Sequence, residues 1–262
     1  MAKTISIGAQ DFGKIRERDC FFVDKTCFIK EWWESNDDVT LITRPRRFGK
    51  TLNMSMLEHF FSNKYEGRSD LFEGLSIWEE EKYRKIQGTY PVLFLSFAGI
   101  KYTNFRNTRA VMNMNIARLC TRFQSMMEDD IFSKKDRIKF ENIEDDMPDD
   151  VATMSINLIC EWLYRYYGKK CIVLIDEYDT PMQEAYMYGF WDEITAYIRS
   201  LFNNTFKTNP YLERGIMTGI TRVSKESIFS DLNNLNVITT TSEKYATAFG
   251  FTEEEVFKAM DL

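Results

Sequence analysis

Residues 40–52 read TLITRPRRFGKTL, a short apolar run followed by a basic turn, a lysine and a threonine. This order predicts a strand that turns into a helix, with backbone N–H groups and the positive end of the helix facing a phosphate. The complete phosphate-binding signature is G-x-x-x-x-G-K-[ST], and Gly49, Lys50 and Thr51 hold its last three positions. Arg44 stands where the first glycine belongs. The phosphate half of the loop is therefore intact, while its opening half is altered.

The sequence on either side of the loop has the pattern that this interpretation requires. Apolar residues at 39, 41 and 42 predict a short buried strand before the loop. After it, Leu52, Met56 and Phe60 recur at helical spacing. A bare G-K-T is also what a polar helix start would show, so a second motif is needed to separate the two interpretations.

That second motif is CIVLIDEYD, residues 171–179. Its four consecutive apolar residues predict a strand that is buried on both faces, as in a parallel sheet covered by helices. Asp176 and Glu177 end the strand. Nucleotide hydrolysis needs such a pair, because one acid holds the Mg²⁺ shell and the next orients and deprotonates the attacking water. An acidic turn after a core strand is the alternative, but both motifs in this order favour a hydrolysis site.

Composition limits the class of protein. The chain has 262 residues, 44% of them hydrophobic, which suffices for one large α/β domain or one and a half smaller ones. Its net charge of −6 argues against broad non-specific binding of nucleic acid. The single histidine, His59, argues against a histidine-based metal site or catalytic triad.

The cysteines and the distribution of apolar residues bear on localisation. The five cysteines form no C-x-x-C pair, which favours buried thiols in a reducing cytoplasm. The sequence has no apolar stretch long enough to span a bilayer and no secretory signal core, so we expect a cytoplasmic protein without membrane contact.

The remaining elements are expected as follows. Asp24 caps a helix over 28–33 that either docks on the sheet or covers the base of a nucleotide. A strand follows over 90–97, one or two helices over 105–128 and a helix over 154–166. The acidic run 138–150 is expected as an exposed mobile loop, in preference to a metal site. A loop from Asp179 leads to a helix beginning near Ile194, and strands follow at 214–221 and 237–241.

Four stretches of the chain carry a resemblance to a known family. They are FGKIRERDCFFVDKT, RPRRFGKTL, CIVLIDEYD and TGITRVSKESIFSDLNNL, in this order. Together they resemble the bacterial AAA-ATPase-like family, in which an ATPase domain is commonly followed by a restriction-endonuclease-like domain. The loop of that family also reads R-P-R-R-F-G-K-[ST], so Arg44 looks like a family trait.

The resemblance and the motifs together imply a three-layer α/β P-loop NTPase with a mostly parallel sheet of about five strands. Residues 1–38 would form an N-terminal helical segment packed on the core, 39–250 the ATPase core, and 251–262 the start of a lid helix. A capping box of Thr252 and Glu255 opens that helix, and the chain stops about two turns later, which predicts a fragment of a longer protein.

The expected ligands are ATP and Mg²⁺, and each candidate residue has a role. Lys50 would neutralise the β- and γ-phosphates, Thr51 and Asp176 would hold the metal, and Glu177 would orient the lytic water. By position and resemblance, Thr221 would sense the γ-phosphate and Arg222 would add positive charge. The full nucleotide-binding set is Arg46, Arg47, Phe48, Gly49, Lys50, Thr51 and Leu52.

Two rival functions and the identity of the partners stay open. One rival is a nucleotide-dependent switch or scaffold that binds without meaningful turnover. The other is a nucleic-acid binder that contacts phosphates through Arg44, Arg46 and Arg47. We expect nucleotide as the main partner, nucleic acid through a missing C-terminal domain, and a homo-oligomer. One of Arg46 and Arg47 would contact phosphate, and the other would either pair with an acid such as Asp179 or act on a neighbouring subunit as an arginine finger.

Overall fold

The computed structural model describes residues 4–221 and 228–260. Five strands form a single sheet in the order β2-β3-β4-β1-β5, and every neighbouring pair is parallel. The strands are β1 Val39–Thr43, β2 Val92–Ser96, β3 Cys171–Asp176, β4 Leu212–Gly219 and β5 Leu235–Ile238. The predicted α/β fold with a parallel sheet of about five strands is confirmed.

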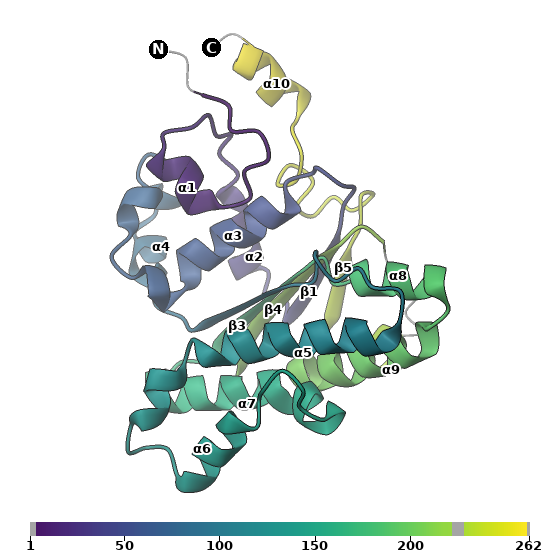
Figure 1. Cartoon of the computed structure of the whole chain (residues 1–262). Coiled ribbons are helices and arrows are strands. Elements are labelled where there is room, and N and C mark those ends of the chain that lie inside the picture. Colours follow the sequence, from purple (N-terminus) through teal and green to yellow (C-terminus); the bar gives the residue numbers. More distant parts are fainter. Residues whose placement is uncertain (1–3, 222–227, 261–262) are drawn as a thin grey trace.

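Helices cover both faces of this sheet, so the molecule has three layers (Figure 1). One face is covered by α5 Phe105–Thr121, α7 Asp149–Tyr167 and α9 Trp191–Phe202, and the other by α3 Lys50–Phe61 with α1 Phe12–Glu17 and α2 Cys27–Glu34. The shorter helices are α4 Glu81–Ile86, α6 Lys134–Glu141, α8 Thr180–Tyr188 and α10 Glu253–Met260. None of the helices in the described residues is long and apolar enough to cross a membrane.

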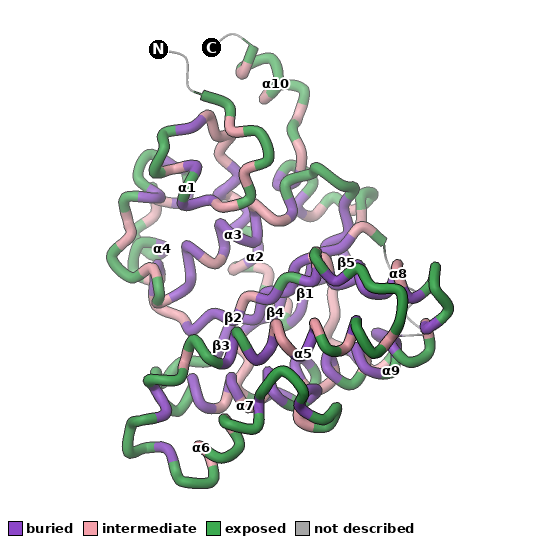
Figure 2. The backbone as a smooth tube through the Cα atoms, viewed as in Figure 1, coloured by how far each residue is buried: buried purple, intermediate pink, exposed green. Residues whose placement is uncertain are grey.

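The central strands are buried on both faces (Figure 2). Along β3, Ile172 and Leu174 belong to the apolar core beneath α3, whereas Val173 and Ile175 belong to the core beneath α5, α7 and α9. Strand residues alternate between faces, so one continuous apolar run supplies both cores. Met112, Met126 and Met127, which lie in the stretch 105–128, are likewise buried.

Two local expectations were wrong, and a third was right only in part. The stretch after Asp179 is not a loop, because α8 begins at Thr180 with Pro181 in its first turn, where proline is tolerated. The acidic run 138–150 is a loop only over residues 142–148, because α6 extends to 141 and α7 begins at 149. Asp24 does not cap the helix at 28–33; it accepts hydrogen bonds from the Thr26 N–H and from the Ser76 N–H.

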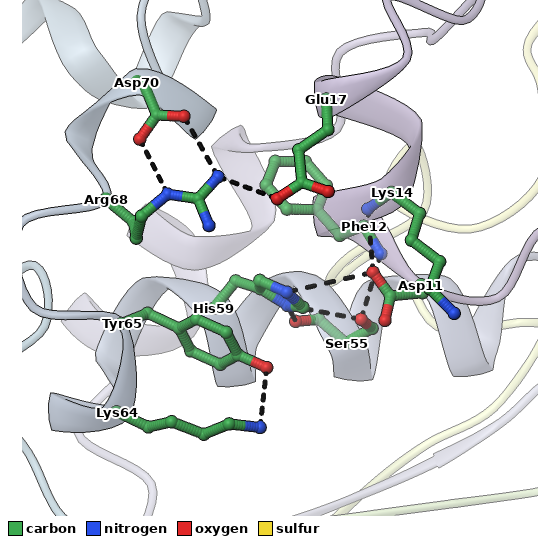
Figure 3. Close-up of polar contacts among 10 residues, drawn as sticks. All are labelled: Asp11, Phe12, Lys14, Glu17, Ser55, His59, Lys64, Tyr65, Arg68 and Asp70. Atoms are coloured by element: carbon green, nitrogen blue, oxygen red, sulfur yellow. Dashed lines mark hydrogen bonds and ion pairs between the residues drawn. The ribbon is translucent and has the colours of Figure 1, made fainter.

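The N-terminal segment is attached to α3, the helix that follows the loop (Figure 3). The Phe12 N–H donates to Ser55 Oγ at 3.0 Å. His59 Nδ1 lies 2.8 Å from the Ser55 carbonyl oxygen, and its Nε2 lies 3.9 Å from Asp11 Oδ1. A Cβ at Gly13 would come within 2.5 Å of that Nε2, so glycine permits this close approach. The segment before β1 is therefore held beside the loop helix.

Candidate functional site

The loop lies at the carboxyl edge of the sheet, between the end of β1 and the start of α3. Strand β4 separates β1 from β3, so the loop and the acidic pair lie on either side of one strand. Gly49 adopts a left-handed φ of 75° immediately before α3, and Arg47 a φ of 67°. Open parallel α/β sheets bind their ligands at this edge.

Lys50 is buried inside the loop. Its ammonium donates to the Arg44 carbonyl at 2.9 Å and to the Pro45 carbonyl at 2.8 Å, so the lysine spans the turn from within. Burial lowers the pKa of Lys50, and the nearby carboxylates of Glu177 and Asp176 partly oppose that shift. The positive charge of Lys50 therefore lies at the backbone turn that we predicted to bind phosphate.

The metal-binding pair predicted from the sequence is brought together. Thr51 Oγ1 donates to Asp176 Oδ2 at 2.8 Å, and Thr218 Oγ1 of β4 donates to Asp176 Oδ1. Asp176 is fully buried. A hydroxyl and a carboxylate side by side are hard oxygen donors that fit Mg²⁺, which keeps several waters and takes few protein ligands. The described residues hold no cluster of three or more His, Cys, Asp or Glu side chains that could bind a metal alone.

Glu177 sits at a strained turn. Its φ is 52°, in the left-handed region that disfavours side chains, and its N–H donates to Thr218 Oγ1 at 3.3 Å. Its carboxylate accepts the Thr180 hydroxyl at 3.2 Å. Strain of this kind costs about 1–3 kcal/mol and persists where the surrounding structure fixes it. The turn therefore holds the glutamate at the edge of the sheet next to Asp176.

Thr221, the predicted γ-phosphate sensor, follows β4, and its hydroxyl donates to Asp179 Oδ2 at 2.9 Å. Arg222, predicted to add charge, lies outside the described residues. Arg46 and Arg47 are exposed, and neither forms an ion pair with Asp179 within the described part of the chain. Of the two alternatives for these arginines, the described contacts do not include the pairing with Asp179, and the arginine finger stays a prediction.

Arg44 points away from the loop. It is 4% exposed, and its guanidinium donates to the Thr239 carbonyl and lies 5.8 Å from the centre of the Phe249 ring. Burial lowers the pKa of Arg44. In place of the first glycine, the chain has a side chain that links the loop to the segment leading to α10.

A cavity of about 200 Å³ opens beside the phosphate half of the loop. The residues around it come from the N-terminal segment, the loop and α3, and the C-terminal segment; they include Phe22, Val23, Gly49, Leu52, Ala248 and Phe251. Phe48 and Leu52, predicted as nucleotide contacts, thus line a mostly apolar space.

The parallel sheet lies between two layers of helices, a buried lysine is bonded to the loop, and a threonine is bonded to the aspartate at the end of β3. Together these features define a P-loop NTPase-like protein. The sequence model "AAA-ATPase_like: Predicted AAA-ATPase" matches residues 6–229. The chain belongs to this AAA-ATPase-like family, and nucleotide binding is implied by that membership.

The chain is similar to a longer curated protein. The chain is 28% identical over 256 residues to a protein of Azotobacter chroococcum mcd 1 described as "Uncharacterized protein in vnfD 5'region". The alignment covers 97% of this chain and 44% of that relative, so the chain spans less than half of the relative's length. No solved structure gives a significant match.

Sequence reasoning missed three contributors to the site. Thr218 hydrogen-bonds Asp176 from the neighbouring strand, Asp179 binds the end of β4, and Arg44 reaches Thr239. A signal existed for Thr218, since it is a polar residue that directly follows the apolar pair Ile216 and Met217 in the stretch RGIMTGIT. The other two depend on pairings between distant parts of the chain, for which the sequence contained no local signal.

Proposed function

We propose that this chain is the nucleotide-binding core of a P-loop ATPase that hydrolyses Mg-ATP. The observation that carries this proposal is the buried Lys50 ammonium, held on the loop's own carbonyl oxygens. A desolvated ammonium on a turn of backbone N–H groups at a helix start is suited to an anion of high charge. The neighbouring pair Thr51 and Asp176 adds the oxygen donors that a nucleotide-bound magnesium ion needs.

Each residue of the site would have its own role in hydrolysis. Lys50 would leave the carbonyls of Arg44 and Pro45 and pair with the β- and γ-phosphates. Thr51 and Asp176 would hold Mg²⁺, which supplies charge neutralisation between the two phosphates when bound. Glu177, fixed by its strained turn, would orient the attacking water and accept its proton once its carboxylate leaves Thr180.

The cavity beside the loop offers a seat for the base. It adjoins Gly49 and Leu52, and the N-terminal segment closes it through Phe22 and Val23. Its mostly apolar walls suit a flat heterocycle. We therefore propose that the N-terminal segment covers the base of the nucleotide, in preference to only docking on the sheet.

A nucleotide-dependent switch is the second candidate, and two contacts favour it. Lys50 is bonded to the loop itself, and the Glu177 carboxylate is bonded to Thr180, so both side chains would have to leave these partners before hydrolysis. A nucleic-acid binder has less support, because the Arg44 guanidinium is buried and bonded within the chain. Only Arg46 and Arg47 of that basic cluster are exposed.

Coupling and assembly are further parts of the proposal. We propose that hydrolysis drives an attached nuclease-like domain or a protein partner, and that nucleic acid is reached through such a domain. The longer length of the Azotobacter relative leaves room for one. We propose a homo-oligomer in which Arg46 or Arg47 acts on a neighbouring copy, and a cytoplasmic location consistent with five free cysteines.

The test is equilibrium binding of Mg-ATP and Mg-GTP, with phosphate release followed in the same samples. Lys50→Ala should lose binding, and Glu177→Gln should bind but not release phosphate. Binding without release by the wild-type protein would favour the switch. If Lys50→Ala bound nucleotide as tightly as the wild type, the loop assignment would be wrong.

A further inference from the structure

The carboxylate of Asp179 is buried and strongly bonded, yet it lies outside the acidic pair assigned to the reaction. It is fully buried in the turn between β3 and α8. Its Oδ2 accepts four hydrogen bonds: from the Ile220 N–H at 3.0 Å, the Thr221 N–H at 2.9 Å, the Thr221 hydroxyl at 2.9 Å and Gln183 Nε2 at 2.9 Å. A buried charge is tolerated when several donors surround it, and two of these donors are backbone amides.

The N–H, the hydroxyl and the carbonyl of Thr221 are all hydrogen-bonded. Asp179 takes its N–H and its hydroxyl, and the hydroxyl of Tyr178 donates to its carbonyl at 2.8 Å. Tyr178 also donates its own N–H to the Thr218 carbonyl at 2.9 Å. The hydroxyl of Thr221 is therefore committed to Asp179 in this state, and the acidic turn and the end of β4 form one bonded unit.

The unit is packed closely as well as bonded. A Cβ at Gly219 would come within 2.5 Å of Tyr178 Cε1 and 2.8 Å of Asp179 Oδ1. Contacts under 3.0 Å require something to shift, so only glycine fits where β4 meets the turn. Asp179 Oδ1 has no hydrogen-bond partner among the described residues.

This unit reaches both halves of the site. Gly219 pairs in register with Thr43, the last residue of β1, and its carbonyl accepts the Arg44 N–H at 3.1 Å. One residue earlier, Thr218 bonds the carboxylate of Asp176 and accepts the N–H of Glu177. Strand β4 is thus connected to the loop on one side and to the acidic pair on the other.

We propose that Asp179 is a positioning residue for hydrolysis: by binding the end of β4 to the acidic turn, it sets Glu177 at a fixed place relative to nucleotide in the loop. This inference rests on the proposed ATPase function. Asp179 does not contact the nucleotide; it acts through Thr221, Thr218 and the backbone of the turn. Misplacement of a reacting group by about 1 Å costs up to roughly 100-fold in rate, so loss of this link should act on turnover.

The test compares Asp179→Asn with Gln183→Leu. Asparagine keeps the shape of the Asp179 side chain but loses the negative charge that accepts four hydrogen bonds. Gln183→Leu removes the one donor that lies on α8 and not at the end of β4. For Asp179→Asn, we expect kcat to fall about tenfold or more while the Kd for Mg-ATP changes less than about threefold. Gln183→Leu should keep both quantities within about twofold of wild type.

A further variant and an amide measurement guard against simple unfolding. Tyr178→Phe removes the hydroxyl that donates to the Thr221 carbonyl, and its kcat should fall by about threefold or more with binding retained. Amide hydrogen exchange at Ile220 and Thr221 should accelerate in Asp179→Asn, while exchange in β1 stays unchanged.

The outcomes separate this inference from the proposed function. Absence of nucleotide binding by the wild-type protein would reject the proposed function. Wild-type turnover in Asp179→Asn, or parallel loss of binding and turnover, would overturn the positioning role alone. If Asp179→Asn did not fold, unchanged kcat in Tyr178→Phe would overturn it.

Discussion

The two halves of the phosphate-binding loop are held by different parts of the molecule. In the phosphate half, Thr51 is bonded to Asp176 of β3, so this half is attached to the sheet. In the opening half, Arg44 donates to the Thr239 carbonyl and lies over the ring of Phe249, so this half is attached to the segment after β5. The signature glycine is replaced by the residue whose side chain reaches the C-terminal segment, Arg44.

The C-terminal segment, defined here as residues 239–255, makes further contacts around the loop. The Gly250 N–H donates to the Phe48 carbonyl at 3.0 Å, and Asn53 Nδ2 of α3 donates to the Ala248 carbonyl at 2.8 Å. This segment lies beyond the residues that the family model matches. The side chains of Thr51 and Arg44 thus attach the loop to two different segments, and we expect the first attachment to govern phosphate binding and the second to govern stability.

Arg44→Ala should have the largest effect on stability and little effect on binding. It removes a charged hydrogen bond to the Thr239 carbonyl and a ring contact, so we expect the free energy of unfolding to fall by ~2–3 kcal/mol. The Kd for Mg-ATP should change less than about threefold. Denaturant unfolding and nucleotide titration measure the two quantities.

Lys50→Ala is the matched control for this prediction, because it changes the other half of the loop. It should raise the Kd by about 100-fold while leaving the free energy of unfolding within ~1 kcal/mol, since it removes a cation that burial disfavours. If Arg44→Ala weakened binding as much as Lys50→Ala, the two attachments would not be independent.

Lys25→Met should have the next largest effect, through the C-terminal segment. The buried Lys25 ammonium donates to the Thr247 carbonyl and to both oxygens of Glu255, all between 2.6 and 2.7 Å. The Glu255 side chain is 24% exposed, so the loss should be ~1–2 kcal/mol, less than for a fully buried pair. Denaturant unfolding at neutral pH measures it.

The same pair predicts a pH dependence. Burial raises the pKa of Glu255, but hydrogen bonds from Lys25 and the Thr252 N–H outweigh burial, so the net pKa lies below its ordinary 4.5. The pair therefore stabilises the fold above pH 4.5 and loses this contribution as the pH falls through the folded-state pKa. Lys25→Met should flatten the stability curve below pH 4.5, and an unchanged curve would contradict the assignment.

The sequence predicted the layers of the fold and the phosphate half of the site because both rest on local patterns. The apolar run Ile172–Ile175 and the G-K-T triplet each carry their own signal. Helix α8 was missed because its apolar residues are divided between the two faces: Met182 and Ala185 are buried, whereas Tyr186 is 80% exposed and Met187 is 71% exposed. The periodicity that identifies a core-facing helix is weak there.

The contacts of the opening half were beyond sequence reasoning for a different reason. Arg44 and Thr239 are 195 positions apart, and Asp179 is bonded to residues 41 and 42 positions later. Arginine in place of glycine looks like a defect in a one-dimensional pattern. Only the folded chain shows that its side chain leaves the loop and binds a carbonyl on another segment.

The smallest predicted effect concerns two glycines with similar backbone angles. Gly49 in the phosphate half has φ 75° and Gly250 in the C-terminal segment has φ 78°. A Cβ at Gly49 would meet nothing within 4 Å, whereas one at Gly250 would lie 3.0 Å from Phe48 Cδ1. Gly49→Ala should therefore cost only the left-handed backbone penalty of ~1 kcal/mol in unfolding free energy.

Gly250→Ala should cost the same penalty plus whatever shift Phe48 must make, about 0.5 kcal/mol more. Thermal unfolding of the two variants side by side measures the difference. Because Phe48 is 39% exposed, its ring has room to move, which keeps this extra term small. Equal losses for the two variants would mean that Phe48 yields freely, and that the Gly250 N–H bond to the Phe48 carbonyl, not ring packing, joins the C-terminal segment to the loop.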